Sequence, residues 1–254
     1  MIGLELQAIY VMWLRQMKRF LRFKSRILAT FIQPLFFLAI FGSGFRNIEI
    51  PGMESEYIIF FAPGIVAMSI MFSSMFAGMS ILWDRQFGFL QEVLVAPVSR
   101  FSIIIGKTLG GATTAIIQGS IILIIVFVFG VPFPTPLGFL MTILFMVLIA
   151  FTAVGFGLVI ASKMRDMQSF PIIMNLIVMP LLLVSSAFFP LQNLPKEALY
   201  ATQINPLFYM VDGLRGSLIG VDNIHPPIID FGILLMICLI VMSIGSYMFS
   251  KSET

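Results

Sequence analysis

The sequence predicts an all-α integral membrane protein with six transmembrane helices. Hydrophobic residues make up 59% of the 254 residues and charged residues only 11%, whereas a soluble domain carries roughly 25% charged residues. Apolar stretches recur along the chain that are long enough to cross a bilayer, for which a helix needs roughly 20 such residues. Basic residues gather in alternate connections between these stretches. The surplus apolar surface is therefore expected to face lipid.

Six apolar stretches account for the predicted spans. Five carry no charged residue, and the third carries only Lys107 near its start. The first stretch follows a basic segment, as a signal peptide does, but it is longer than a signal core and is expected to be retained. The stretches cover residues 27–45, 57–83, 101–131, 137–162, 167–194 and 231–250.

The uneven distribution of basic residues predicts the orientation. If the six stretches span the membrane, twelve lysine and arginine residues lie on the side of both termini and three on the other side. Because cytoplasmic loops carry the excess of positive charge, both termini are expected in the cytoplasm. This bias also explains the net charge of +3 without a nucleic-acid partner.

The N-terminal segment, residues 1–26, is expected to form an interfacial amphipathic helix. Its basic residues recur three or four positions apart and therefore share one helix face, broadly opposite a face with Trp13 and Phe20. A basic amphipathic helix lies in the headgroup layer of the bilayer. Two interpretations remain open, namely a topology anchor alone or a helix that also contacts a cytoplasmic partner.

The connection between the second and third stretches predicts a short cytoplasmic amphipathic helix. Phe87, Leu90 and Leu94 recur at helical spacing, and Pro97 ends the pattern. A helix of this kind at a membrane surface is either a solvated connector or a docking element.

The longest connection, residues 190–230, contains a helix signal on the outer side. Asn205 and Pro206 suit the N-cap and first position of a helix, and Gly220 suits its end. Asp212 and Arg215 lie three residues apart inside this apolar helix and are able to pair. We expect a short helix folded against or into the outer leaflet, where protein or water covers its backbone.

Residues for catalysis or for metal and cofactor binding are not evident in the sequence. His225 is the single histidine, with no cysteine nearby, and is expected to be a solvated loop residue rather than a metal ligand. Gly106-Lys107 resembles the end of a phosphate-binding loop, but Phe101 stands where that loop requires its first glycine. Helix centres without charge argue against an ion-coupled carrier. No enzyme activity, metal or cofactor is therefore expected in this chain itself.

Three features resemble the ABC-2 type permeases, the membrane subunits of one class of ATP-binding-cassette exporter. Residues 85–100, followed by Gly106-Lys107, are similar to that family's segment between its second and third helices. Residues 205–207 and 213–215 are similar to its Asn-Pro and arginine landmarks before the last helix. The plan of six helices after a basic amphipathic start matches as well. The resemblance covers essentially the whole chain, and it is to the drug- and glycolipid-export permeases of prokaryotes in particular.

The resemblance implies a multi-pass permease in a prokaryotic cell membrane. Residues 1–254 would form one transmembrane domain, with 1–26 as the interfacial helix and 27–250 as a six-helix permease core. Two copies, expected as a homodimer, would form the pathway for a hydrophobic or amphipathic substrate such as a drug, lipid or lipid-linked glycan. Two separate ABC ATPase subunits would supply the energy of ATP hydrolysis. The alternative is a self-sufficient channel or secondary carrier, which would transport without such a partner.

The resemblance also assigns roles to two groups of residues. The first would form the coupling helix that contacts the ATPase: Arg85, Phe87, Gly88, Leu90, Glu92 and Leu94. The second would form the re-entrant outer helix: Asn205, Pro206, Asp212 and Arg215. For Arg85 and Glu92 the alternative is solvated surface charge, and for Asp212 with Arg215 it is a local helix pair.

Overall fold

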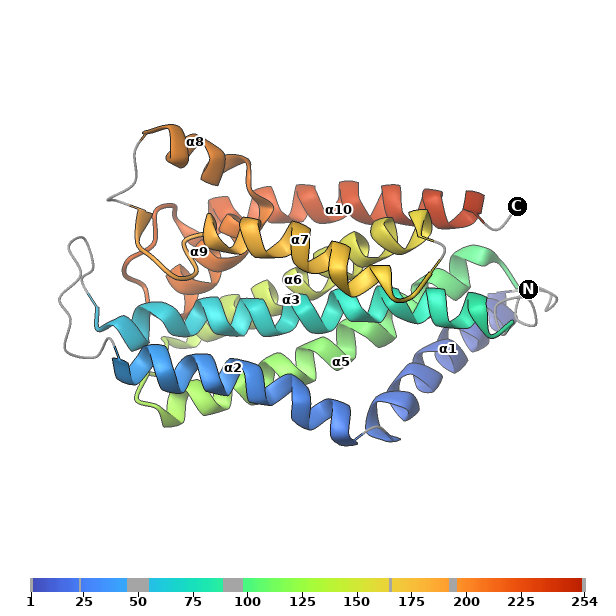
Figure 1. Ribbon diagram of the computed structural model, residues 1–254, viewed down its shortest axis with the longest axis horizontal. Coiled ribbons are helices and arrows are strands. Elements are labelled where there is room, and N and C mark those ends of the chain that lie inside the picture. The colour runs from blue at the N-terminus through green and yellow to red at the C-terminus, as the bar shows by residue number, and fades with distance from the viewer. Residues whose placement is uncertain are drawn as a thin grey trace.

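The long apolar stretches of the sequence form helices that run side by side along one axis (Figure 1). The computed structural model describes residues 2–22, 24–44, 55–88, 98–164, 166–191 and 196–252, and no strand occurs in these ranges. The all-helical prediction is therefore confirmed for this part of the chain. Its α-helices are α1 (Ile2–Arg22), α2 (Lys24–Gly44), α3 (Tyr57–Gln86), α5 (Arg100–Val128), α6 (Pro136–Lys163), α7 (Ser169–Leu183), α8 (Lys196–Ile204), α9 (Pro206–Leu218) and α10 (Pro227–Ser252).

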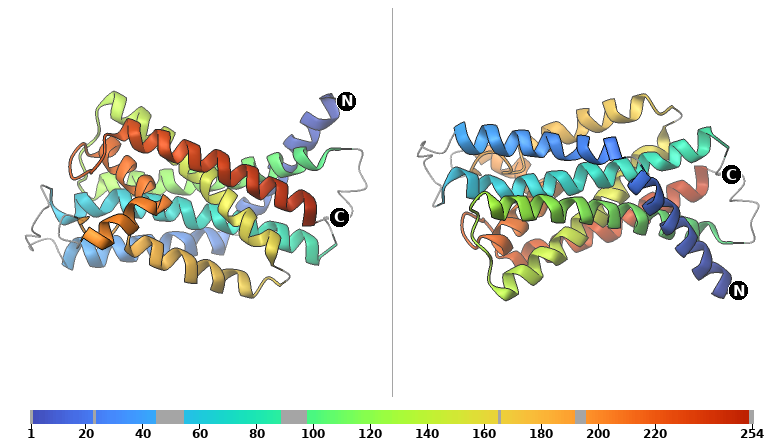
Figure 2. Two further views of the ribbon diagram at one scale, coloured as in Figure 1. Left: turned by 90° about the horizontal axis from the view of Figure 1, so that it is seen from above. Right: turned by 90° about the horizontal axis from the view of Figure 1, so that it is seen from below.

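Both termini lie at the same end of the bundle, which we call the terminal end (Figure 1). The short helices α8 and α9, and the connection from α5 to α6, lie at the opposite end. Helices α2, α3, α5, α6, α7 and α10 run between the two ends, whereas α1 extends away from the bundle axis (Figure 2).

Four described helices are long and apolar enough to cross a membrane. These candidate spans are Tyr57–Asp84, Arg100–Val128, Pro136–Lys163 and Pro227–Phe249. They coincide with the second, third, fourth and sixth predicted stretches, which confirms those stretches as long apolar helices. Two shorter apolar segments, Phe31–Gly42 and Ser169–Leu183, fall within the first and fifth stretches. The complete six-span topology stays a prediction.

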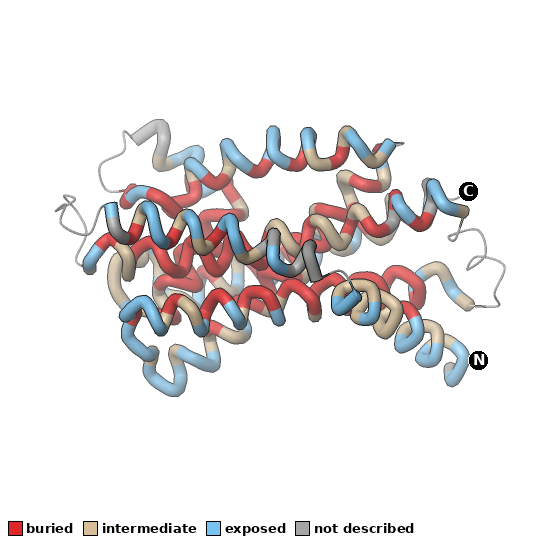
Figure 3. The backbone as a smooth tube through the Cα atoms, turned by 60° about the horizontal axis from the view of Figure 1, so that its bottom comes forward, coloured by how far each residue is buried: buried red, intermediate tan, exposed pale blue. Residues whose placement is uncertain are grey.

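Close helix crossings at glycine hold the centre of the bundle together. A β-carbon on Gly78 of α3 would lie 2.5 Å from the carbonyl carbon of Gly157 in α6, so the two backbones touch. At the crossing of α6 with α10, a β-carbon on Gly245 would lie 3.1 Å from the β-carbon of Leu158. Small residues allow this approach, which is how helices associate when lipid removes the hydrophobic drive between them. Buried residues accordingly line the facing sides of the central helices (Figure 3).

The outer faces of the bundle are apolar. On α10, Met236, Leu239 and Tyr247 are each more than 60% exposed. Exposed apolar surface of this extent marks contact with a membrane or a partner rather than with water. These apolar residues point outward, as a lipid-facing surface requires, and their contact with lipid stays a prediction.

The N-terminal helix packs against the start of α5 through two further glycines. A β-carbon on Gly106 would lie 2.7 Å from the carbonyl oxygen of Ile9, and one on Gly110 would lie 2.6 Å from the β-carbon of Gln16. Helix α1 ends at Arg22 and α2 begins at Lys24. The boundary between the amphipathic helix and the first apolar helix thus lies a few residues before the position expected at 26 and 27.

The fifth apolar stretch does not continue as one helix. Helix α7 stops at Leu183, although the stretch runs to residue 194. Asn205 explains the stop in part, because its side-chain amide donates a 2.6 Å hydrogen bond to the Leu181 carbonyl at the end of α7. Ser186, with a φ of 62°, then turns the chain. Helix α8, which follows, has no counterpart among the sequence predictions.

The glycine crossing of α3 with α6 can be tested by adding one methyl group. We expect Gly78→Ala to lower the free energy of unfolding by about 1–3 kcal/mol, the usual result of overpacking a tight core. The matched control is Gly232→Ala on the exposed face of α10, where a β-carbon meets nothing within 4 Å. There alanine is expected to be neutral or stabilising, by up to about 1 kcal/mol. Thermal unfolding in detergent measures both variants, and equal midpoints would contradict the backbone contact.

Candidate functional site

A buried carboxylate near the end of α3 holds two cations from other helices. Asp84 is 4% exposed, and Arg15 of α1 donates two hydrogen bonds to it, of 2.7 and 3.0 Å. Lys107 of α5 is 5% exposed and places its Nζ 2.7 Å from Oδ2 of the same carboxylate. We call Arg15, Asp84 and Lys107 the Asp84 cluster. It joins α1, α3 and α5.

The three charges of the Asp84 cluster depend on one another. A buried ion that loses its partner is strongly destabilising, because little water remains to solvate it. The two parallel hydrogen bonds from Arg15 also fix the direction of its guanidinium, as bidentate pairs do. Nearby, the Arg19 guanidinium lies 4.7 Å from the centre of the Trp83 ring, a cation–π contact. Helix α1 is therefore anchored to the last turns of α3.

Helix α1 also contacts the start of α5. Its Glu5 carboxylate accepts hydrogen bonds of 3.0 and 2.9 Å from the backbone N–H and hydroxyl of Ser99, the N-cap of α5. Hydrogen bonds from the Ser102 and Ser99 side chains hold the pKa of the Glu5 carboxyl below its usual range. Asp84 precedes the segment 87–97 and Ser99 follows it. Helix α1 therefore binds the residues on both sides of the segment in which the sequence predicts the coupling helix.

A second buried cation, Arg215 of α9, ties three elements together at the opposite end. It is 1% exposed and donates 2.7 Å hydrogen bonds to the hydroxyl and the carbonyl of Ser186, which follows α7. Its Nε lies 3.3 Å from the Phe60 carbonyl in α3, and its guanidinium lies 3.8 Å from the centre of the Phe60 ring. We call Arg215, Ser186 and Phe60 the Arg215 cluster.

The predicted pair between Asp212 and Arg215 forms only at the limit of an ion pair. Their closest side-chain atoms are 4.0 Å apart. Asp212 mainly accepts backbone hydrogen bonds, at 3.0 Å from Ile224 and 2.9 Å from His225. It thereby closes the connection between α9 and α10 onto α9.

His225 lies in the connection before α10, as expected, but its side chain is only partly exposed and is not simply solvated. Its side chain is 26% exposed, and its Nδ1 lies 3.2 Å from the fully buried carboxylate of Asp230. Its ring stacks on Tyr209 and meets Phe208 edge to face. Asp212, His225 and Asp230 each offer one possible metal-ligating atom, and these atoms lie within 4.8 Å of one another. This grouping was not predictable from the sequence, because Asp212 and Asp230 belong to two different helices.

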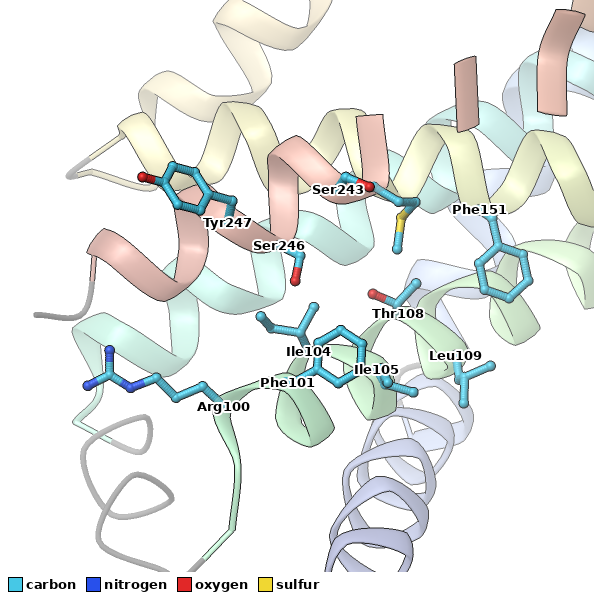
Figure 4. A pocket seen from close by; sticks show the side chains of 11 residues that line it. Arg100, Phe101, Ile104, Ile105, Thr108, Leu109, Phe151, Ser243, Ser246 and Tyr247 are labelled. Carbon is cyan, nitrogen blue, oxygen red and sulfur yellow. The ribbon is translucent and has the colours of Figure 1, made fainter. Parts of the chain in front are cut away.

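A groove between α5 and α10 lies near the terminal end (Figure 4). It encloses about 710 Å³, and its lining is mostly apolar with hydroxyl groups from Thr108, Ser243 and Ser246. Such a groove accommodates an apolar or amphipathic molecule, because the hydroxyls can satisfy a few polar atoms while most of the surface remains apolar.

The described geometry is that of a membrane bundle with buried charges at both ends, and sequence comparison assigns its family. The family profile described as ABC-2 type transporter matches residues 7–219. The chain belongs to the ABC-2 type transporter family. This confirms the resemblance seen in residues 85–100, 205–207 and 213–215.

Relatives of this ABC-2 protein carry the names of transport permeases. The chain is 26% identical over 240 residues to the inner membrane transport permease YadH of Escherichia coli strain K12, covering 93% of this chain and 92% of the relative. It is 27% identical over 213 residues to the transport permease ycf38 of Cyanophora paradoxa, covering 83% and 73%. It is 31% identical over 170 residues to the multidrug ABC transporter permease YbhR of Escherichia coli strain K12, covering 66% of this chain and 45% of that longer relative. These names agree with a membrane transport component rather than an enzyme.

The predicted outer-helix residues fall where the sequence indicated, whereas most coupling-helix residues do not belong to the described structure. Asn205 caps α9 by accepting a 3.0 Å hydrogen bond from the Leu207 N–H, with Pro206 as the first helical residue. After α3, Phe87 is 72% exposed and Gly88 has a φ of +73°. The predicted coupling residues that lie outside the described part of the chain are Leu90, Glu92, Leu94 and the side chain of Arg85.

The Asp84 cluster was missed by sequence reasoning, although it left a signal. Lys107 is the only charged residue within the six apolar stretches, and Asp84 directly follows the second stretch. A lone charge in an apolar helix requires a partner, and the nearest charge at the same end of the bundle is a natural candidate. That Arg15 is the residue of α1 that binds Asp84 could not be predicted, because the N-terminal segment contains five other basic residues that look equivalent to it.

A double-mutant cycle tests the dependence within the Asp84 cluster. Asp84→Leu leaves Lys107 buried beside an apolar side chain, and we expect it to lower the free energy of unfolding by roughly 3–5 kcal/mol. Adding Lys107→Met removes the stranded charge and is expected to recover most of this loss. Unfolding of the four proteins in detergent measures the coupling. Simple addition of the two single effects would show that the residues do not interact.

Proposed function

We propose that this ABC-2 permease is the membrane-spanning subunit of an ATP-driven exporter in a prokaryotic cell membrane. Two copies, as a homodimer, form the pathway, and two separate ATPase subunits hydrolyse ATP. The family assignment and the relative named as a multidrug ABC transporter permease support this proposal. The observation that carries it is that α1 binds the residues on both sides of residues 87–97. It binds Asp84 before them and Ser99 after them.

The proposed topology has six spans, with α2 and α7 added to the four long helices, and both termini in the cytoplasm. The position of both termini at one end supports an even number of crossings. Helix α7 has 15 residues and so covers only roughly 22 Å at 1.5 Å per residue. The turn that follows it, from Ser185 to Phe188, is buried by protein, which is the condition under which irregular backbone is tolerated at membrane depth.

The proposed coupling element comprises residues 85–97, with Arg85, Phe87, Gly88, Leu90, Glu92 and Leu94 at or near the ATPase. In this proposal the ATPase pushes on this segment when it binds ATP, and α1 moves with it. The Asp84 cluster passes the movement to α3 and α5, because it joins both helices to α1. An ATP-driven change then biases the permease between two arrangements.

The proposed outer element is α9, acting as a re-entrant helix that restricts the exit of the pathway. Asn205 and Pro206 begin it, and Arg215 fastens it to α3 and to the turn after α7. The cargo proposed for this pathway is hydrophobic or amphipathic, such as a drug, a lipid or a lipid-linked glycan. The apolar groove between α5 and α10, with its few hydroxyls, supports that class of cargo.

Affinity purification from the native host tests the ATP-driven function. We expect the tagged chain, extracted in mild detergent, to retain a P-loop ATPase in equal amounts, identified by mass spectrometry. Glu92→Arg is expected to lose this ATPase without changing the unfolding midpoint. Glu56→Arg, a change of an exposed carboxylate before α3 at the opposite end, is the control and is expected to keep it. Reproducible absence of an ATPase from a folded chain that still transports would favour a self-sufficient channel or carrier.

Cysteine labelling tests the orientation. The single cysteine, Cys238, is buried, and Cys238→Ala provides the background. A membrane-impermeant thiol reagent is expected to label Glu54→Cys in intact cells, because residue 54 precedes α3 on the outer side. Asp166→Cys, in the connection between α6 and α7, is expected to react only after the cells are permeabilised. The reverse pattern would show that the topology is inverted. Labelling of both positions in intact cells would show that residues 54 and 166 lie on the same side of the membrane, which contradicts the six-span topology.

A further inference from the structure

A histidine and two carboxylates meet where α9 approaches the start of α10. We call Asp212, His225 and Asp230 the Asp230 cluster; their ligand atoms lie within 4.8 Å of one another. Both aspartates are 0% exposed. The distance from His225 Nδ1 to Asp230 Oδ1 is 3.2 Å. This is the distance of a hydrogen bond between them, and it is also close to the roughly 3.4 Å between two ligands that are each bonded at about 2.1 Å to one tetrahedral ion.

One atom of the cluster is unsatisfied. Within the described residues, Oδ2 of Asp230 is buried and has no hydrogen-bond partner. A buried carboxylate oxygen without a partner is destabilising and calls for an explanation such as an ion. Asp212 differs, because the N–H groups of Ile224 and His225 hold its two oxygens in place. A carboxylate has about four acceptor positions, so Asp212 retains capacity for a cation.

The charges around the cluster favour a cation of charge two. Two buried aspartates lie near each other on α9 and α10, and the guanidinium of Arg215 lies 4.0 Å from Asp212. Arg215 gives its closest hydrogen bonds to Ser186 instead. A histidine nitrogen with carboxylate oxygens is a ligand set for zinc and similar transition metals, whereas magnesium and calcium prefer oxygen alone.

The surrounding backbone holds the cluster in shape before any ion binds. Gly213 allows close approach of α9 to α10, because a β-carbon there would lie 3.0 Å from the β-carbon of Asp230. Asn223 donates a 2.8 Å hydrogen bond to the His225 carbonyl and thereby fixes the connection that carries the histidine. The His225 side chain, at 26% exposed, offers a route by which an ion enters.

We infer that Asp212, His225 and Asp230 bind one divalent transition-metal ion of the zinc class, with water completing its coordination. The ion links α9 to the first turn of α10, and it binds the Oδ2 of Asp230, which otherwise has no hydrogen-bond partner among the described residues. Metal binding at this cluster does not depend on the proposed transport function, and its measurement involves neither the ATPase nor cargo.

Equilibrium dialysis of the purified full chain tests the inference. The protein carries a tag without histidine, is freed of metal with a chelator in detergent, and is dialysed against Zn²⁺ or, in parallel, Mg²⁺. We expect about one Zn²⁺ per chain by elemental analysis, no comparable retention of Mg²⁺, and a higher unfolding midpoint with Zn²⁺. Failure of the folded wild-type chain to retain Zn²⁺ would overturn the proposal.

Matched substitutions locate the ion. Asp230→Asn and His225→Gln keep the size of each side chain, and each is expected to weaken Zn²⁺ binding by about 100-fold or more, since even outer-shell changes weaken metal sites by roughly 10- to 100-fold. Asp222→Asn is the control, because Asp222 accepts hydrogen bonds from Ser55 and offers no ligand atom to the cluster, and it is expected to keep the ion. Zn²⁺ retained equally by all three variants would place it elsewhere and overturn the proposal. An Asp230→Asn protein that has the wild-type midpoint with and without Zn²⁺ would likewise overturn it, in favour of a proton shared by the two aspartates.

Discussion

The structure depends on the requirement that every charge buried in an apolar bundle has a partner held within it. Removing a charge from water is expensive, and only close, well-directed partners offset that loss. Two cations meet this requirement at the two ends of α3. Lys107 pairs with Asp84 near the end of the helix, and Arg215 binds the Phe60 carbonyl near its beginning. Between Phe60 and Asp84 the helix covers roughly 36 Å at 1.5 Å per residue, about the thickness of a bilayer core.

The glycine crossings decide which helices behave as one body. Gly78 and Gly157 bring the backbones of α3 and α6 into contact, while Gly106 and Gly110 do the same for α5 and α1. Close-packed backbones resist small deformations, so such pairs shift as units rather than bend gradually. The Asp84 cluster then joins the α1–α5 pair to the α3–α6 pair. A push on α1 accordingly acts on the whole bundle and not on one peripheral helix.

Local signals in the sequence predicted the elements, and tertiary partners decided the rest. Asn205, Pro206 and Gly220 mark the limits of α9 because capping depends on neighbouring residues alone, and Gly220 indeed has a φ of +78°. The early end of α7 was not predictable in this way, because Asn205, 24 residues away, takes the Leu181 carbonyl. The partners of His225 were unpredictable for the same reason, since Asp230 and the Tyr209 ring come from two different helices. Hydropathy likewise shows Lys107 as the lone charge of the third apolar stretch but contains no information on which carboxylate it meets.

The unequal bonds of Arg215 indicate how the two ends of the bundle are linked. Its contacts to Ser186 are both 2.7 Å, whereas its bond to the Phe60 carbonyl is 3.3 Å. A bond of 3.3 Å already exceeds the usual range of roughly 2.7–3.2 Å for N–H···O hydrogen bonds and is the weakest of the three. If α3 slides along its axis, the bond to the Phe60 carbonyl is therefore the first of these three hydrogen bonds to break. Arg215 thus binds the turn after α7 by its two shortest hydrogen bonds and binds α3 by a longer one, supplemented by the contact of its guanidinium with the Phe60 ring. A shift of α3 relative to α9 would therefore act first on the bond to the Phe60 carbonyl, which makes that bond the most sensitive of the three to a movement of α3.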